Sequence, residues 1–225
     1  MTAEEVGRRV SELLFKAGAI HCNLSQPYML AGGWASPVYI DVRLLFGEHD
    51  MRNQLVTLVS DYLIAHFPAN AFDAVVGAET AGIPLSVSLA DRNGFDLRYV
   101  RKRPLGIGRD AQVEGGSVDG LRVLLVDDIT TDGSSKLNFA RGLRAAGAHL
   151  EHVLSVFFHD AFPGARDRLA EAGLNLHALA GWNDLLRADS GTLHEHERAE
   201  IERFLADPVV WSARHGGRVS ASNRW

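Results

Sequence analysis

Apolar positions along the chain follow two different spacings. Near the N-terminus they recur at helical intervals after a Thr2–Glu5 capping pattern, which predicts a helix that ends near Gly18. Beyond residue 73, short continuous apolar runs alternate with segments of helical spacing. The predicted strands are 38–42, 74–76, 97–100, 123–126, 153–158 and 174–179, and the further predicted helices are 50–67, 83–91, 134–146, 165–172 and 195–205.

This alternation predicts the fold class. Strands that alternate with helices form right-handed βαβ units around a mostly parallel sheet, so we expect an α/β fold with helices flanking a central sheet. We expect one domain over residues 1–215, with a small hood built from about 1–48 and 180–215. The Gly-, Ser- and Arg-rich residues 216–225 are expected to form a disordered tail.

Composition and charge limit the possible classes of protein and the expected compartment. The chain has 225 residues, 46% of them hydrophobic and 23% charged, which is typical of one globular domain with its own core. The net charge of −5 argues against a general nucleic-acid binder, and no apolar run is long enough to cross a membrane. The single cysteine, Cys22, excludes an internal disulfide and fits a reducing, cytoplasmic compartment.

The strongest chemical signal follows the predicted strand 123–126. Two acids, Asp127 and Asp128, come first, and a turn rich in hydroxyl side chains over 129–135 then leads into a helix. Backbone N–H groups in such a turn form an anion site, and the helix N-terminus reinforces it. Gly133 allows close backbone approach, while the acids can accept hydrogen bonds from sugar hydroxyls.

Other interpretations of this segment are weaker. The acids and Ser134 have structural uses as turn and helix caps, but two acids after four buried apolar residues are costly without a ligand. No Walker A pattern is present, because Gly133 is not followed by Lys and then Ser or Thr. The glycines at 106–111 match a dinucleotide fingerprint incompletely and open no clear helix.

The run 123–135 resembles the phosphoribosyl pyrophosphate motif of type I phosphoribosyltransferases. Four further segments, 33–39, 77–84, 99–102 and 112–115, resemble orotate phosphoribosyltransferases in the same order along the chain. The resemblance covers roughly residues 30–160. It implies a transferase that moves the phosphoribosyl group of 5-phosphoribosyl 1-pyrophosphate (PRPP) onto orotate, in pyrimidine biosynthesis.

The resemblance also implies residue roles. Asp127, Asp128 and Lys102 take the catalytic positions. The positions that bind PRPP are Glu79, Thr80, Ala81, Arg101, Lys102, Asp127, Asp128, Ile129, Thr130, Thr131, Asp132, Gly133, Ser134 and Ser135. The positions that bind the base are Tyr39, Ile40, Thr131 and His159. Mg²⁺ is expected to arrive on PRPP rather than on protein ligands, and a loop over 103–116 is expected to close over the site of a neighbouring subunit in a homodimer.

The chain departs from the family pattern at four positions. Leu105 and Ile107 stand where the family has a loop lysine and a histidine, and neither can donate a proton. Ala31 replaces a base-site lysine, and His159 aligns with an arginine that pairs with the orotate carboxylate. Three readings therefore stay open: an orotate enzyme with an altered loop, a binding or regulatory protein with little catalysis, or a transferase for another base.

Overall fold

The computed structural model describes residues 1–104 and 112–220. A six-stranded sheet forms its centre, in the order β10-β9-β8-β5-β6-β7, and only the edge strand β7 runs antiparallel to its neighbour. The strands are β5 (Ala74–Ala78), β6 (Asp96–Val100), β7 (Val113–Glu114), β8 (Arg122–Thr130), β9 (His149–Phe158) and β10 (Asn175–Gly181). The predicted α/β fold with a mostly parallel sheet is confirmed.

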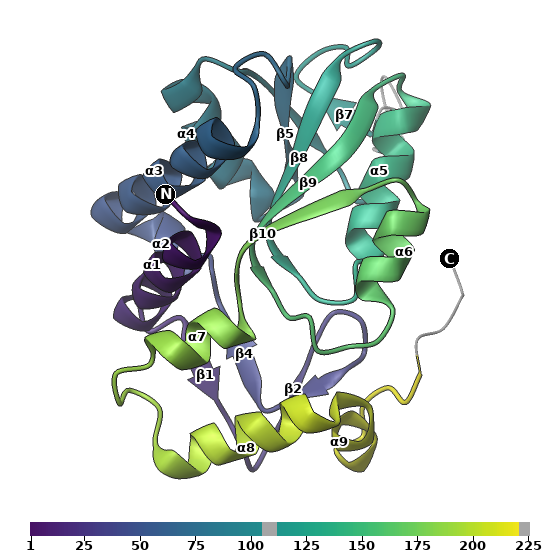
Figure 1. Cartoon of the computed structure of the whole chain (residues 1–225). Helices are drawn as coiled ribbons and strands as arrows, with labels where there is room; N and C mark the ends of the chain where they lie inside the picture. The colour runs from purple at the N-terminus through teal and green to yellow at the C-terminus, as the bar shows by residue number, and fades with distance from the viewer. Residues whose placement is uncertain (105–111, 221–225) are drawn as a thin grey trace.

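Helices cover both faces of this sheet (Figure 1). One face carries α1 (Ala3–Lys16), α3 (His49–His66) and α4 (Gly82–Asn93), and the other carries α5 (Ser134–Ala145) and α6 (Ala165–Glu171). Neighbouring residues on β5 show how one strand serves both layers. Val75 packs in the first core and Val76 in the second, because successive strand side chains point to opposite faces.

A separate layer forms the hood at the bottom of Figure 1. Two short antiparallel pairs build its N-terminal part: β1 (Ile20–Cys22) with β4 (Val38–Ile40), and β2 (Tyr28–Met29) with β3 (Ala35–Ser36). The helices of the hood are α7 (Trp182–Ala188), α8 (Glu195–Ala206) and α9 (Pro208–Arg214), whereas the short helix α2 (Leu44–Gly47) packs beside α3. None of the helices in the described part of the chain combines the length and apolar character of a membrane span.

Two local features differ from the pattern expected from sequence. Strand β8 continues beyond residue 126 to Thr130, because its pairing with β9 persists from Asp127 opposite Ser155 to Thr130 opposite Phe158. The acid pair therefore lies within the strand and not in the turn after it. The start of the expected tail is anchored: Gly217 N donates to Ser212 O at 2.8 Å, and Arg218 N donates to Gly33 O at 2.8 Å.

Candidate active site

A large cavity of about 1030 Å³ lies where β8 ends, between the sheet and the hood. Its walls come from five parts of the chain that are far apart in sequence. The lining residues are Ala31, Gly32, Tyr39, Arg43, Phe46, Glu79, Thr80, Ala81, Pro84, Lys102, Asp127, Asp128, Ile129, Thr131, Asp132, Gly133, Ser134, Ser135, Lys136, Phe139 and Arg218. The cavity thus gathers most of the residues expected from sequence at one place.

Asp127 is held by a lysine that the sequence did not single out. The Nζ of Lys136, in the first turn of α5, lies 2.5 Å from Asp127 Oδ2 and also donates to Ile129 O. Both side chains are almost fully buried, with relative exposures of 2% for Lys136 and 9% for Asp127. A buried carboxylate needs such a partner, because unpaired burial of charge is strongly unfavourable.

Asp128 is in a different electrostatic position. Its Oδ1 accepts a hydrogen bond from the backbone N–H of Ile129 at 2.8 Å. Burial, reinforced by the nearby negative charge of Asp127, raises the pKa of Asp128 to about 7. The two adjacent acids therefore differ: Asp127 is paired with a cation, and Asp128 lies at the cavity with a carboxyl that titrates near neutrality.

The turn after β8 makes the phosphate-loop geometry. Gly133 has φ +80° and caps the start of α5, a conformation that favours glycine. Asp132 Oδ1 accepts from Ser134 N at 3.0 Å and also from the Ser134 hydroxyl, so a phosphate at this amide has to displace that carboxylate. Thr130 is fully buried and bonds Ser155 at 2.6 Å, so its hydroxyl faces away from the cavity.

The loop after β5 forms the opposite wall. It contains a cis peptide bond between Glu79 and Thr80. Lys102 N donates to Glu79 Oε2 at 2.7 Å, which joins the ends of β5 and β6 at the cavity edge. Gly82 packs directly on β8, where a Cβ would come within 2.2 Å of Val126 O. Arg101 is not a lining residue, because its Nε pairs with Glu114 Oε1 at 3.0 Å.

The hood supplies the remaining wall. Tyr39 lines the cavity, and its hydroxyl accepts a hydrogen bond from Arg43 at 2.8 Å. Ile40 is next to it in sequence but is only 3% exposed, because alternation along β4 directs it into the core. Of these two predicted base-site residues, the structure therefore brings only Tyr39 to the cavity.

His159 does not reach the cavity. It is 1% exposed and packs against the rings of Phe157, Phe162 and Trp182. Within residues 1–104 and 112–220 nothing hydrogen-bonds its Nδ1, and burial lowers the pKa of His159 to about 4, so the ring is neutral at physiological pH. The expected role of His159 toward a base carboxylate finds no support in this placement.

Sequence reasoning missed four lining residues with clear chemical character: Lys136, Arg43, Phe46 and Arg218. Lys136 follows the phosphate loop directly, but nothing in its spacing shows that it turns back under Asp127. Arg218 falls in the segment that was expected to be disordered. Leu105 and Ile107, where the family's loop lysine and histidine are missing, lie outside the described residues.

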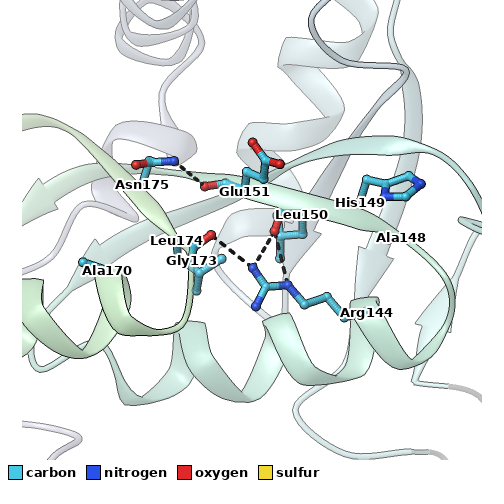
Figure 2. A pocket seen from close by; sticks show the side chains of 9 residues that line it. All are labelled: Arg144, Ala148, His149, Leu150, Glu151, Ala170, Gly173, Leu174 and Asn175. Atoms are coloured by element: carbon cyan, nitrogen blue, oxygen red, sulfur yellow. Dashed lines mark hydrogen bonds between the residues drawn. The ribbon is translucent and has the colours of Figure 1, made fainter.

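A second pocket, of about 640 Å³, lies elsewhere, near the starts of β9 and β10 (Figure 2). Its one arginine, Arg144, donates to the carbonyl oxygens of Leu150, Ala172 and Gly173. These bonds join α5 to the turn after α6 and engage the cation with backbone. Arg144 in this pocket therefore has a structural role, and the acids and hydroxyl groups expected from the sequence lie at the larger cavity.

A mostly parallel sheet whose central strand carries an acid pair and runs into a hydroxyl-rich turn at a cavity is the arrangement of type I phosphoribosyltransferases. No protein-family model matches the chain. The orotate phosphoribosyltransferase of Sinorhizobium medicae is 38% identical over 217 residues, covering 96% of this chain and 94% of that protein. The chain belongs to the orotate phosphoribosyltransferase family.

Solved structures agree with this assignment. The crystal structure of the Aeropyrum pernix orotate phosphoribosyltransferase has a TM-score of 0.67 and 30% identity, covering 79% of this chain and 97% of that one. The Mycobacterium tuberculosis orotate phosphoribosyltransferase in complex with PRPP has a TM-score of 0.60 and 23% identity, covering 80% of this chain and 98% of that one, and supports the fold alone.

Proposed function

We propose that this protein transfers the phosphoribosyl group of PRPP to orotate, giving orotidine 5′-phosphate and pyrophosphate in pyrimidine biosynthesis. The observation that carries the proposal is the end of β8, where Asp127, Asp128 and the turn 129–135 meet one large cavity. The similarity to curated orotate phosphoribosyltransferases covers nearly the whole chain, and this supports orotate as the base.

The donor is expected to lie across the carboxyl ends of β5 and β8. In this proposal the 5-phosphate occupies the turn 131–135 at the N-terminus of α5, where amides and hydroxyls supply donors. Asp127 and Asp128 accept hydrogen bonds from the ribose hydroxyls. The pyrophosphate lies against the backbone of residues 79–81 and the ammonium of Lys102.

The reaction follows from charge placement. As the bond from C1 of the ribose to pyrophosphate lengthens, positive charge develops on the sugar and negative charge on the leaving group. Asp128 stabilises the first charge and Lys102 the second, in a cavity partly screened from water. A ring nitrogen of orotate, placed beside Tyr39, then forms the new bond to C1. The protein acts chiefly by positioning both reactants and neutralising charge.

We expect magnesium to reach this site bound to the donor. Within residues 1–104 and 112–220, no cluster of three or more His, Cys, Asp or Glu side chains is arranged to hold a metal ion. Carboxylate oxygens suit Mg²⁺, and Asp128 lines the cavity and, unlike Asp127, has no lysine partner among the described residues. Bound to PRPP, the ion would neutralise the leaving pyrophosphate, with Asp128 nearby to hold it.

The oligomeric state and the cellular compartment also belong to this proposal. We expect a homodimer, in which the segment 103–116 of one subunit serves the site of the other, as the family resemblance implies. We expect the protein to act in the cytoplasm, which fits a chain with one cysteine. Leu105 and Ile107 are then compensated by other cations. If they limit the rate instead, Leu105→Lys is expected to increase turnover.

Turnover with purified protein tests the function. We expect orotate, PRPP and Mg²⁺ to yield orotidine 5′-phosphate and pyrophosphate in equal amounts, with no product when uracil or adenine replaces orotate. Asp128→Asn provides the matched variant of low activity. PRPP binding without conversion of any base would favour a binding protein, and conversion of another base would reassign the substrate.

A further inference from the structure

We propose that Asn138, in the second turn of α5, is a positioning residue for the pyrophosphate end of PRPP, because it holds the backbone that carries Lys102 at the cavity. This inference deepens the proposed function and rests on it. Lys102 lines the cavity two residues beyond the end of β6, and it is the cation expected to neutralise the leaving pyrophosphate. Whatever fixes this lysine determines how well its charge is placed.

The backbone of Lys102 lies beyond the regular pairing of the sheet. Strand β6 ends at Val100, which is paired with Val113 on β7. One further backbone bond follows, from Arg101 N to Gln112 O at 2.8 Å. At Lys102 both backbone polar groups then bond to side chains. Because a lysine ammonium sits on a flexible four-carbon stem, a fixed backbone is the means by which the protein limits where it can reach.

Two side chains hold Lys102 from opposite ends of its backbone. Lys102 N donates to Glu79 Oε2 at 2.7 Å, and Asn138 Nδ2 donates to Lys102 O at 2.8 Å. The first bond ties the residue to the loop after β5, and the second ties it to α5. Glu79 itself lines the cavity, whereas Asn138 lies outside the lining that the described residues form. A change at Asn138 therefore reaches a ligand through Lys102.

The orientation of the Asn138 amide is fixed by a neighbour on the same helix. A terminal nitrogen of Arg141 donates to Asn138 Oδ1 at 3.2 Å, and residues three apart share a helix face. An amide has a donor end and an acceptor end. The opposite orientation would set Nδ2 against the guanidinium and Oδ1 against the carbonyl of Lys102. Both neighbours thus favour the orientation in which Asn138 donates to Lys102.

Helix α5 connects the two ends of the expected donor site. It begins at Ser134, in the turn where the 5-phosphate is expected, and Asn138 lies four residues later. Four residues correspond to about 6 Å along a helix axis and return to nearly the same face. One rigid element therefore carries the phosphate turn and, through Asn138, also holds the backbone of Lys102. The spacing between the two anionic ends of PRPP is set by this helix.

The exposure of the pair argues against a role in folding. Asn138 is half-buried and Lys102 is exposed, so water can replace their hydrogen bond at little cost to the folded state. Alanine is also a better helix former than asparagine in the middle of a helix. Asn138→Ala is therefore expected to fold, and the use of the bond lies in where it places Lys102.

Comparison of two ligands tests this role. PRPP and orotidine 5′-phosphate share the ribose and the 5-phosphate, and only PRPP carries the pyrophosphate. In titration calorimetry with Mg²⁺ present, we expect Asn138→Ala to weaken PRPP about 3- to 10-fold and to leave orotidine 5′-phosphate within about 1.5-fold. Asn138→Leu, which keeps the size of the side chain without its donor, is expected to match. Asn53→Ala, an exposed asparagine on α3, is the control.

A double-mutant cycle with Lys102→Ala locates the effect. Lys102→Ala alone is expected to weaken PRPP about 10- to 100-fold, because it removes the charge that faces the pyrophosphate. Addition of Asn138→Ala to this variant is expected to change PRPP affinity by less than about 1.5-fold, since the side chain that Asn138 positions is gone. A role of Asn138 in the general stability of α5 would give the same loss in both backgrounds.

The other outcomes contradict the inference in recognisable ways. Equal loss of both ligands in Asn138→Ala would show that Asn138 supports the phosphate turn, and no change in either ligand would exclude it from the site. An effect that persists in full in Lys102→Ala would show that Asn138 does not act through this lysine. If the wild-type protein binds neither ligand, the proposed function itself fails, which is distinct from failure of the role of Asn138.

Discussion

The two sides of the cavity are built in different ways. The side on which we propose that the ribose and phosphate bind comes from one run of the chain, residues 126–136, in which a buried strand leads through a short turn into a helix. The side that faces the base is assembled from the glycine-rich turn near Ala31, from Tyr39 and Arg43 on the hood, and from Arg218 almost 180 residues later. A contiguous site can be recognised in sequence, and an assembled one requires the fold.

The two sides also differ in how deeply their charged side chains are buried. On the phosphate side, Lys136 compensates Asp127 from within the core at 2.5 Å. On the base side, the Arg43 side chain is 53% exposed and the Arg218 side chain 23% exposed, so both are less buried than Lys136. Loss of the charge on Lys136 is therefore expected to affect folding, whereas loss of a charge on the base side is expected to affect affinity.

The largest expected effect is that of Lys136→Met. Removal of this ammonium leaves the Asp127 carboxylate buried without its partner, and we expect the free energy of unfolding to fall by about 3–5 kcal/mol. Urea denaturation of the variant and of Lys16→Met, an exposed lysine at the end of α1, measures the difference. The double variant Asp127→Asn/Lys136→Met is expected to recover part of the loss. Equal effects of the two lysine variants would contradict the buried pair.

Asp128→Asn is expected to act on catalysis more than on stability. The amide cannot match the charge that a carboxylate presents to a cation-like ribose, so kcat/KM for PRPP is expected to fall about 100-fold. Steady-state kinetics with orotate checks this. Asp96→Asn, an exposed acid at the start of β6, is the control and is expected to match the wild type. If the activity of Asp128→Asn stays within a few-fold of the wild type, Asp128 has no catalytic role of the kind proposed.

The titration of Asp128 gives a pH dependence with a defined sign. Its pKa is raised to about 7 in the folded protein, against an ordinary value near 4, so the folded state binds more protons than the unfolded state between these values. Without ligand, stability relative to Asp128→Asn is expected to fall as the pH rises from about 4 to 7. Over the same range PRPP binding is expected to strengthen, since the ionised carboxylate is the better acceptor for ribose hydroxyls. Parallel pH profiles of the two proteins would contradict this assignment.

The smallest expected effect is that of His159→Phe. The ring is enclosed by aromatic side chains, and nothing among the described residues hydrogen-bonds its Nδ1, so phenylalanine is expected to keep KM for orotate within about twofold. Because the folded pKa of His159 is about 4 and the unfolded value near 6.5, the wild type loses stability as the pH falls through this interval. The variant is expected to lose less. A large rise in KM would place His159 in the base site after all.

The comparison explains what the sequence predicted. Strand, acids, glycine and hydroxyls follow one another at the end of β8, so the sequence alone predicted that Asp127, Asp128 and the following turn act together, and the structure places them at one cavity. Lys136 was missed because its role depends on how the first turn of α5 sits beneath the strand. The same holds for other parts of the site. Thr130 was assigned to the donor, but strand pairing directs its hydroxyl to Ser155.

The base side was the less predictable one for a physical reason. Alternation along a strand sends Ile40 into the core and Tyr39 to the cavity, and one sequence does not show which face is which. Arg218 lies in a segment with the composition of a loose tail, yet its backbone is bonded to Gly33 and Ser212. Contacts over such sequence distances are set by tertiary packing and leave no local pattern.

A crystal structure with orotidine 5′-phosphate bound would test the division of the cavity most directly. The account predicts the phosphate on the amides of residues 131–135, the ribose hydroxyls on Asp127 and Asp128, and the base beside Tyr39. A nucleotide whose phosphate avoids that turn, or whose base lies away from Tyr39, would contradict it.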